Sequence, residues 1–138
     1  MFADLIEHSM ELSDAELDAA IRANELAHRK LAAEQAALVA VSAARGAYRM
    51  DGQRTVTSYL RATCNLSKGA AAQRRKLAEV CDAVPDLGDA LLAGRVGDDQ
   101  VLEIARIWSN PRTRRFFARV APVYLDYAEH DSHRVLRG

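Results

Sequence analysis

The stretch SDAELDAAIRANELAHRKLAAEQAALVAVSAARG, residues 13–46, decides the fold class of this chain. It contains no proline, and no glycine before its last residue, and it is rich in Ala, Leu, Glu and Arg, which lose little side-chain freedom in a helix. Ser13 and Glu16 have the spacing of a capping box, and Arg45 with Gly46 is typical of a helix end. The pattern predicts one long helix over residues 13–44, of about eight turns.

Capping and breaking residues divide the rest of the chain into shorter helices. Asp51-Gly52 is a turn signal, Ser67 is a typical N-cap, and Asn110-Pro111 interrupts a helix. No segment alternates between apolar and polar residues with a period of two, so no strand is expected. The predicted helices after the first run from Thr55 to Thr63, from Ser67 to about Cys81, from Asp86 to Ala93, from about Asp98 to Trp108, and from Pro111 towards Glu129.

This order of helices predicts an all-α fold. We expect about six helices, with one long N-terminal helix packed on two successive hairpins that resemble helix-turn-helix units, over residues 55–80 and 87–108. A chain of 138 residues with 49% hydrophobic residues suits a single core. The expected organisation is a lead-in (1–12), one helical domain (13–130) and a C-terminal tail (131–138).

Charge is sorted along the chain although its total is zero. Residues 1–44 carry a net charge of −5, residues 45–81 of +6, residues 82–110 of −4 and residues 111–138 of +3. A block of one sign attracts a polyanion even when the whole molecule is neutral. Two interpretations follow. Either the basic block binds nucleic acid, or the acidic and basic blocks face each other inside one monomer or across a dimer.

The first hairpin has the residue types of a DNA-binding unit. On a helical wheel, Lys68, Arg75 and Lys76 fall opposite the apolar side of its second helix, and Gln73 lies at the border. Such a helix suits a DNA major groove, where a Gln side chain makes bidentate contact with a base edge. We therefore predict a non-catalytic DNA-binding module. Its contacts would come from Lys68, Gln73, Arg75 and Lys76, with Arg54 and Arg61 as phosphate clamps.

The long first helix supports an alternative from another class. Its apolar residues recur close to heptad spacing, which is typical of helices that pair. The alternative prediction is a protein-interaction or dimerisation module, in which the acidic helix pairs with itself or with another chain. The interface residues would be Leu17, Ile21, Leu31 and Leu38.

Two further clusters of charged residues are not expected to form a binding site. Asp98 and Asp99 open the last helix of the second hairpin and would repel phosphate, so that hairpin is expected to be structural. A later basic cluster flanks two phenylalanines and is interpreted as a solvated first turn; it comprises Arg112, Arg114, Arg115 and Arg119.

No catalytic motif is found, so no enzymatic activity and no cofactor are expected within this chain. It has no glycine-rich phosphate loop, no G-x-S-x-G and no H-E-x-x-H. His130 and His133 are three residues apart but lack further ligands nearby, so no metal site is predicted. Cys64 and Cys81 have no C-x-x-C spacing and are expected to be buried free thiols.

Residues 1–12 include three acidic side chains and no long apolar run, so neither a secretory signal nor a membrane span is predicted there. We therefore expect a cytoplasmic protein with no membrane partner.

Several short motifs follow one another in a set order between residues 13 and 130. They are RGAYRMDG (45–52), SYLR (58–61), NLS (65–67) followed by Ala70 to Leu77, Pro85, ALLAGRV (90–96), DQV (99–101) and NPR (110–112). This order resembles domain of unknown function 222, also called the thirteen-E-twelve repeat family, which occurs in actinobacteria and their phages. Three positions depart from the family pattern. Tyr59 replaces the usual Trp, Asn65 replaces Gly, and Gly97 replaces a frequent capping Ser.

Members of that family commonly carry this helical domain ahead of a C-terminal HNH endonuclease module. The resemblance therefore implies an all-helical module that positions a nuclease, on DNA or on a partner. Nothing after Asn110 supplies the paired histidines and asparagine of an HNH motif. The chain is expected to be either the N-terminal part of a longer nuclease or a short stand-alone member. Its expected partners are DNA, a second copy of itself or a C-terminal nuclease module.

Overall fold

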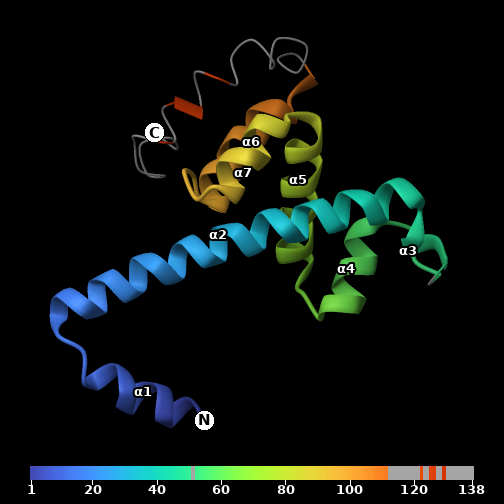
Figure 1. Ribbon diagram of the computed structural model, residues 1–138. Coiled ribbons are helices and arrows are strands. Elements are labelled where there is room, and N and C mark those ends of the chain that lie inside the picture. Colours follow the sequence, from blue (N-terminus) through green and yellow to red (C-terminus); the bar gives the residue numbers. More distant parts are fainter. Residues whose placement is uncertain (51, 112–121, 123–124, 127–128, 130–138) are drawn as a thin grey trace.

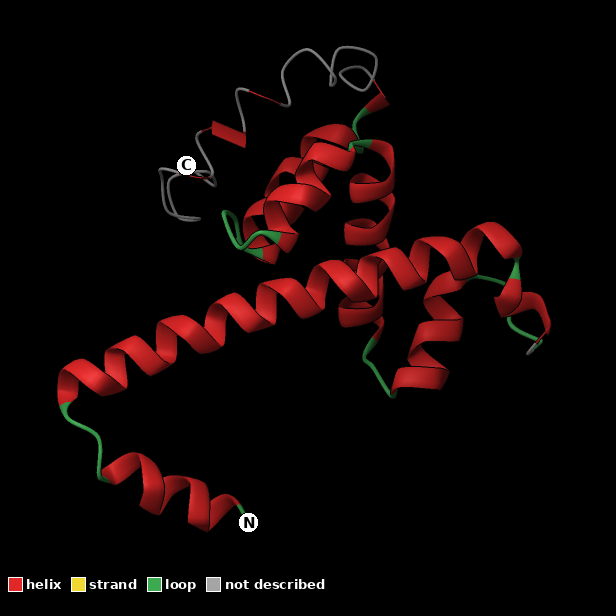
Figure 2. Ribbon diagram, viewed as in Figure 1, coloured by secondary structure: helices red, strands yellow, loops and turns green. Residues whose placement is uncertain are grey.

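The computed structural model describes residues 1–50 and 52–111, together with residues 122, 125, 126 and 129 (Figure 1). Within these residues the chain is all-helical, which confirms the predicted fold class, and Figure 2 shows the helices joined by short loops. The helices are α1 (Phe2–Met10), α2 (Asp14–Arg45), α3 (Ala47–Met50), α4 (Val56–Cys64), α5 (Lys68–Ala83), α6 (Pro85–Leu92) and α7 (Asp98–Trp108).

Five of these helices coincide with predicted ones: α2, α4, α5, α6 and α7. Two were not expected. The expected lead-in, residues 1–12, contains α1, and a single turn of helix, α3, follows α2 directly. The predicted helix from Pro111 towards Glu129, the basic cluster of residues 112–119, Asp51, His130, His133 and the tail lie largely or wholly outside the described residues.

Local capping sets the ends of the helices. At the start of α2, Ser13 Oγ accepts a hydrogen bond from the Glu16 N–H at 3.1 Å, and the Glu16 carboxylate accepts one from the Ser13 N–H at 3.1 Å. The backbone of Gly46 adopts the left-handed conformation at the other end, with φ of 67°. The predicted capping box and terminal glycine are both confirmed, because each depends only on residues within one helical turn.

α5 is the central helix of the fold. It crosses α2, with α6 and α7 packed beside one half of its length and α4 beside the other (Figure 1). Val80 of α5 is completely buried. The other fully enclosed large side chains come from α6, α7 and the turn between them: Leu87, Leu91, Val96, Val101 and Ile104.

α2 joins this core through the second half of its length. Its two buried residues, Ala36 and Val39, lie in this half of the helix, and α2 packs mainly against α5 and α6. Further towards its N-terminus, Arg29 Nη1 donates a 2.8 Å hydrogen bond to the carbonyl oxygen of Gly94 in the α6–α7 turn. The first half of α2 projects away from the other helices and carries α1 at its end (Figure 1), and its residues before Arg29 are exposed. We call α1 together with residues 11–25 the arm.

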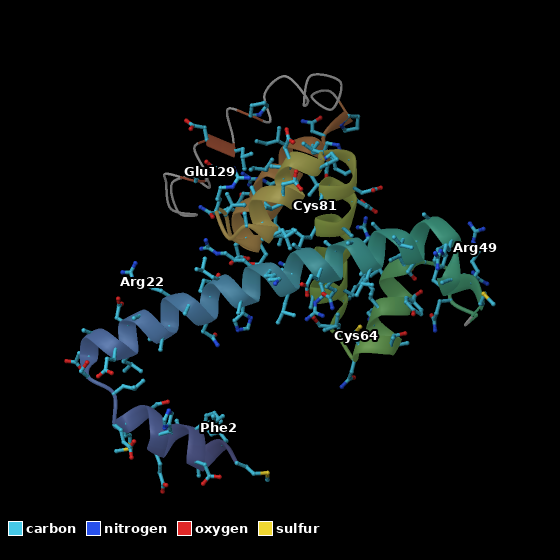
Figure 3. All side chains as sticks on the ribbon, in the orientation of Figure 1. Phe2, Arg22, Arg49, Cys64, Cys81 and Glu129 are labelled. Carbon is cyan, nitrogen blue, oxygen red and sulfur yellow. The ribbon has the colours of Figure 1, made fainter. Side chains whose placement is uncertain are left out.

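The expectation for the two cysteines is half wrong. Cys81 is partly buried against the core, but Cys64 is exposed. Cys64 is the last residue of α4, and that end of the helix turns away from the core into the loop before α5. Figure 3 shows the two side chains in these different settings.

Candidate nucleic-acid interface

α4 and α5 form a helix-turn-helix unit joined by a three-residue turn, residues 65–67. Asn65 ends α4 in the left-handed conformation, with φ of 53° and ψ of 50°. The N–H of Leu66 then donates to the Arg61 carbonyl at 3.2 Å, which closes the end of α4. Ser67 Oγ accepts from the Ala70 N–H at 3.1 Å and starts α5. The predicted hairpin over residues 55–80 is thus present as a capped, sharply turned pair of helices.

One departure from the family pattern, Asn65 in place of Gly, is compatible with the fold. The turn needs a positive φ at this position, and glycine adopts it most freely. Asparagine is the common substitute, because its short polar side chain tolerates the left-handed region. The replacement of Gly by Asn therefore preserves the geometry of the turn.

Three of the predicted contact residues lie on the exposed face of α5: Lys68, Gln73 and Lys76. At about 100° per residue, Lys76 lies about 80° and Gln73 about 140° around the helix from Lys68, so the two lysines share one side and Gln73 lies at the border of the buried face. The buried face holds the core residues Ala71, Leu77, Ala78 and Val80. A single helix therefore presents two cations and one amide to solvent while its other face anchors it.

Arg75 differs from these three, because its guanidinium is held within the molecule. Its Nε donates to Thr57 Oγ1 of α4 at 3.0 Å, and its Nη1 donates to Glu79 Oε1 at 2.8 Å. The side chain is about one-third exposed. The helical wheel placed Arg75 on the outward face but could not show that α4 lies within its reach. In this structure Arg75 links the two helices of the unit.

The two predicted phosphate clamps flank α4. Arg54 precedes the N-cap Thr55, and Arg61 lies in the last turn of the helix. Both side chains are exposed. One basic residue that was not singled out, Arg49 of α3, is also exposed and lies over the Tyr48 ring at 5.4 Å from the ring centre. Its only signal in the sequence is its membership of the basic block.

Arg74 is turned the other way, towards α2. It lines a shallow hollow of about 680 Å³ with residues of the acidic segments, among them Glu34 and Asp98. This position fits the alternative interpretation of the charge pattern, in which blocks of opposite sign meet inside one monomer. The basic block is thus divided: Arg74 and Arg75 are half-buried against other helices, and Lys68 and Lys76 face solvent.

The residues predicted for a dimer interface all lie uncovered on α2. Leu17, Ile21, Leu31 and Leu38 are between 40% and 71% exposed. Side chains of this size and polarity usually contact the core, so their exposure is informative as a group. Leu31 lines the hollow beside Arg74, and Leu38 lies at a second opening between α2 and α4.

That second opening is an apolar groove with a volume of about 210 Å³. Its floor includes the buried residues Val39 and Leu60, and Leu38 and Cys64 stand exposed at its rim. α2 and α4 both pack against α5, and the space between them stays open. The remaining lining residues are Gln35, Ser42, Val56, Tyr59 and Thr63. We call this feature the α2–α4 groove.

Among the residues that the structure describes, two titratable groups have shifted pKa values. Burial raises the pKa of the Cys81 thiol from 9.0 to about 11, because the thiolate would lose its hydration. Hydrogen bonds from the backbone and then the side chain of Ser13 lower the pKa of the exposed Glu16 carboxyl. Neither group lies on the exposed face of α5. The described residues contain no cluster of three His, Cys, Asp or Glu side chains that could hold a metal ion.

Comparison with known families gives one match. The family model described as Domain of unknown function (DUF222) matches residues 18–120, which is most of the chain. Comparisons with curated proteins and with solved structures gave no match. None of the helices in the described part of the chain is long and apolar enough to span a membrane.

Proposed function

The chain belongs to the DUF222 family of domains of unknown function, and we propose that it is a non-catalytic DNA-binding module whose recognition helix is α5. The observation that carries the proposal is the helix-turn-helix unit with Lys68, Gln73 and Lys76 on the exposed side of its second helix. DNA-binding units of this shape place the N-terminal half of the second helix in the major groove.

Each exposed residue has a role that follows from its chemistry. Lys68 is the first residue of α5, where the N–H groups of the helix terminus also attract phosphate. Gln73 lies one to two turns further along and carries an amide that can pair with an adenine edge. Lys76 follows on the same side as Lys68. Arg61 and Arg54, at the two ends of α4, would hold the flanking phosphates.

Arg75 takes a supporting role in this proposal. Its bond to Thr57 links α5 to α4, and its bond to Glu79 holds the guanidinium on α5, so its loss would act on DNA through the shape of the unit. The Lys residues make no such contacts in the described structure. They are therefore the residues whose substitution tests DNA binding without disturbing the fold.

Fluorescence anisotropy with a labelled random duplex tests the proposal, at about 50 mM and about 200 mM salt. Binding should weaken steeply at the higher salt, because the release of counterions supplies most of the affinity. K68E/K76E should abolish it. The matched control R22E/K30E changes the net charge equally at two exposed positions of α2 and should bind much more like the wild type. Absence of binding at both salt concentrations, or equal loss of binding in both variants, would contradict the proposal.

We further propose that the module positions a nuclease whose chemistry lies outside this chain, as the HNH association of the family suggests. No step of DNA cleavage is assigned to any residue here. Incubation of the purified chain with supercoiled plasmid and Mg²⁺ should leave the plasmid intact under conditions in which the chain is bound. Cleavage that survives further purification would contradict a non-catalytic role.

A second candidate function, a protein-interaction module, is favoured by the exposure of Leu17, Ile21, Leu31 and Leu38 on α2. Sedimentation velocity of L31D against wild type tests it, because an aspartate in the interface would lower the sedimentation coefficient to that of a monomer. DNA binding by α5 should be unchanged in this variant. An unchanged oligomeric state would remove Leu31 from any self-interface.

A further inference from the structure

α1 is an amphipathic helix whose apolar side has nothing packed on it in the described structure. Phe2, Leu5, Ile6 and Met10 share one face and are between 48% and 78% exposed. Asp4, Glu7 and Glu11 lie on the opposite side, at helical spacing. Figure 3 shows Phe2 on the arm, far from the core that contains Cys81. A helix with this pattern usually lies against an apolar partner surface.

The α2–α4 groove has the properties of such a surface. It is lined mainly by apolar side chains and is open to solvent. Recognition of an amphipathic helix by a hydrophobic groove is a recurrent mode of binding, in which side chains at intervals of three and four residues act as anchors. Phe2, Leu5 and Ile6 have this spacing.

α1 cannot reach the groove of its own chain. Gln35, at the nearer end of the groove, lies 21 residues beyond the start of α2, which is about 32 Å along the helix axis. The nine residues of α1 span about 14 Å, and the three residues that join it to α2 add at most about 10 Å. Folded straight back, α1 therefore falls short by about 8 Å. Any α1 in this groove comes from another molecule.

The distribution of charge selects between two ways in which a second copy could pair. Residues 1–25 hold seven acidic side chains and one basic, Arg22, so two arms repel each other. The segment that surrounds one side of the groove, residues 45–76, holds eight basic side chains and one acidic. Arg45 follows Ser42 by three residues and so continues the groove face of α2. Long-range attraction thus favours the arm on the groove over the arm on an arm.

We infer that α1 of one molecule binds the α2–α4 groove of a second copy, in a reciprocal exchange that forms a twofold dimer. The apolar face of α1 enters the groove, and its acidic face stays towards solvent. The electrostatic attraction between the arm and the basic block is therefore long-range, and no ion pairs form inside the groove. This inference rests on the interaction function proposed for the exposed apolar face of α2. It names α1 of a second copy as the segment that covers Leu38 on that face. It does not depend on DNA binding.

A complementation experiment tests the exchange by sedimentation velocity, from about 1 µM to about 200 µM chain. L5D/I6D damages the arm and leaves the groove intact, and L38D damages the groove and leaves the arm intact. All three side chains are exposed, so the fold of the monomer should survive, which circular dichroism checks. Each variant alone should dimerise at least about tenfold more weakly than wild type. A mixture of the two should form a heterodimer, because one intact arm then meets one intact groove.

The alternative outcomes each overturn the exchange and are distinguishable. A wild-type monomer at every concentration removes the dimer. Dimerisation by L38D alone would point to pairing between arms, and this pairing would strengthen with added salt. Dimerisation by L5D/I6D alone, lost in L31D, would leave the α2 face as an interface but remove α1 as its occupant. Two monomeric variants that fail to associate when mixed would also exclude the exchange.

Discussion

Arg75 Nε lies 3.0 Å from Thr57 Oγ1, so the middle of α5 is hydrogen-bonded to the first turn of α4. The same guanidinium reaches Glu79 at 2.8 Å, one turn further along its own helix. Arg75 thereby links the two helices of the helix-turn-helix unit, although the sequence alone predicts that it contacts DNA. Lys76, its neighbour in the chain, remains exposed.

This difference between neighbours predicts different effects of substitution. R75A and T57A should each lower the free energy of unfolding by about 1 kcal/mol, and the double variant should cost less than their sum, because both remove one hydrogen bond. K76A should leave stability unchanged and reduce the salt dependence of DNA binding by about one phosphate contact. Urea denaturation and anisotropy titrations measure these effects. Additive losses in the R75A/T57A pair would show that the bond contributes no coupling.

Asn65 offers a test of the turn. N65G should leave stability unchanged or raise it slightly, since glycine adopts φ of 53° without steric cost. N65A should lower it by about 1 kcal/mol, because alanine has neither that freedom nor the side-chain oxygen. Thermal denaturation of the two variants side by side provides the comparison. Equal stability of N65A and wild type would mean that the turn relaxes to another conformation.

Substitution by alanine should have opposite effects on stability at Gly94 and at Gly88. Gly94 has φ of 78°, and a Cβ there would lie 2.7 Å from Leu26 Cδ2, so G94A should destabilise the fold by about 1–3 kcal/mol. Gly88 lies within α6, and its added Cβ would meet Cys81 Cβ at an ordinary 3.5 Å. G88A should therefore stabilise by up to about 1 kcal/mol. Chemical denaturation of both variants gives the sign directly. The double variant L26A/G94A removes the clash between the new Cβ and Leu26. It should therefore recover only the part of the lost stability that this clash causes.

The raised pKa of Cys81 makes stability depend on pH at alkaline values. The folded thiol keeps its proton until about pH 11, whereas the unfolded thiol loses it near pH 9.0. The contribution of this thiol to the free energy of unfolding is therefore fully present below about pH 9 and is lost between pH 9 and 11. The loss is at most about 3 kcal/mol. The difference in unfolding free energy between wild type and C81A should shrink or reverse over this range. A constant difference would show that Cys81 ionises normally in the folded protein.

The two thiols should also react at different rates. Cys64 is exposed at the rim of the α2–α4 groove, and Cys81 is held as a partly buried thiol. A thiol reagent at pH 8 should modify Cys64 rapidly and Cys81 only slowly, because the thiolate is the reactive form. Peptide mass spectrometry after short exposure identifies the site. In the exchanged dimer, α1 of the second copy should slow modification of Cys64 as the concentration of the chain rises.

Sequence patterns could predict the helices because their signals are local. The capping box at Ser13 and the N-cap at Ser67 act over three residues, and each appears in the structure where expected. α1 has a local signal too, because Phe2, Leu5, Ile6 and Met10 recur at helical spacing. The candidate site was predictable in part, since three exposed residues of α5 follow from helical periodicity.

The sequence by itself determined the all-α class, the main helix boundaries and the membership of the family, because capping, breaking and periodic patterns act between residues a few positions apart. Only the tertiary structure decided which cations of the basic block are exposed, that Cys64 is solvated, and that a groove stays open between α2 and α4. Thr57 and Arg75 are 18 residues apart, and Leu26 and Gly94 are 68 apart. Contacts at such separations depend on how the helices cross, which no local pattern specifies.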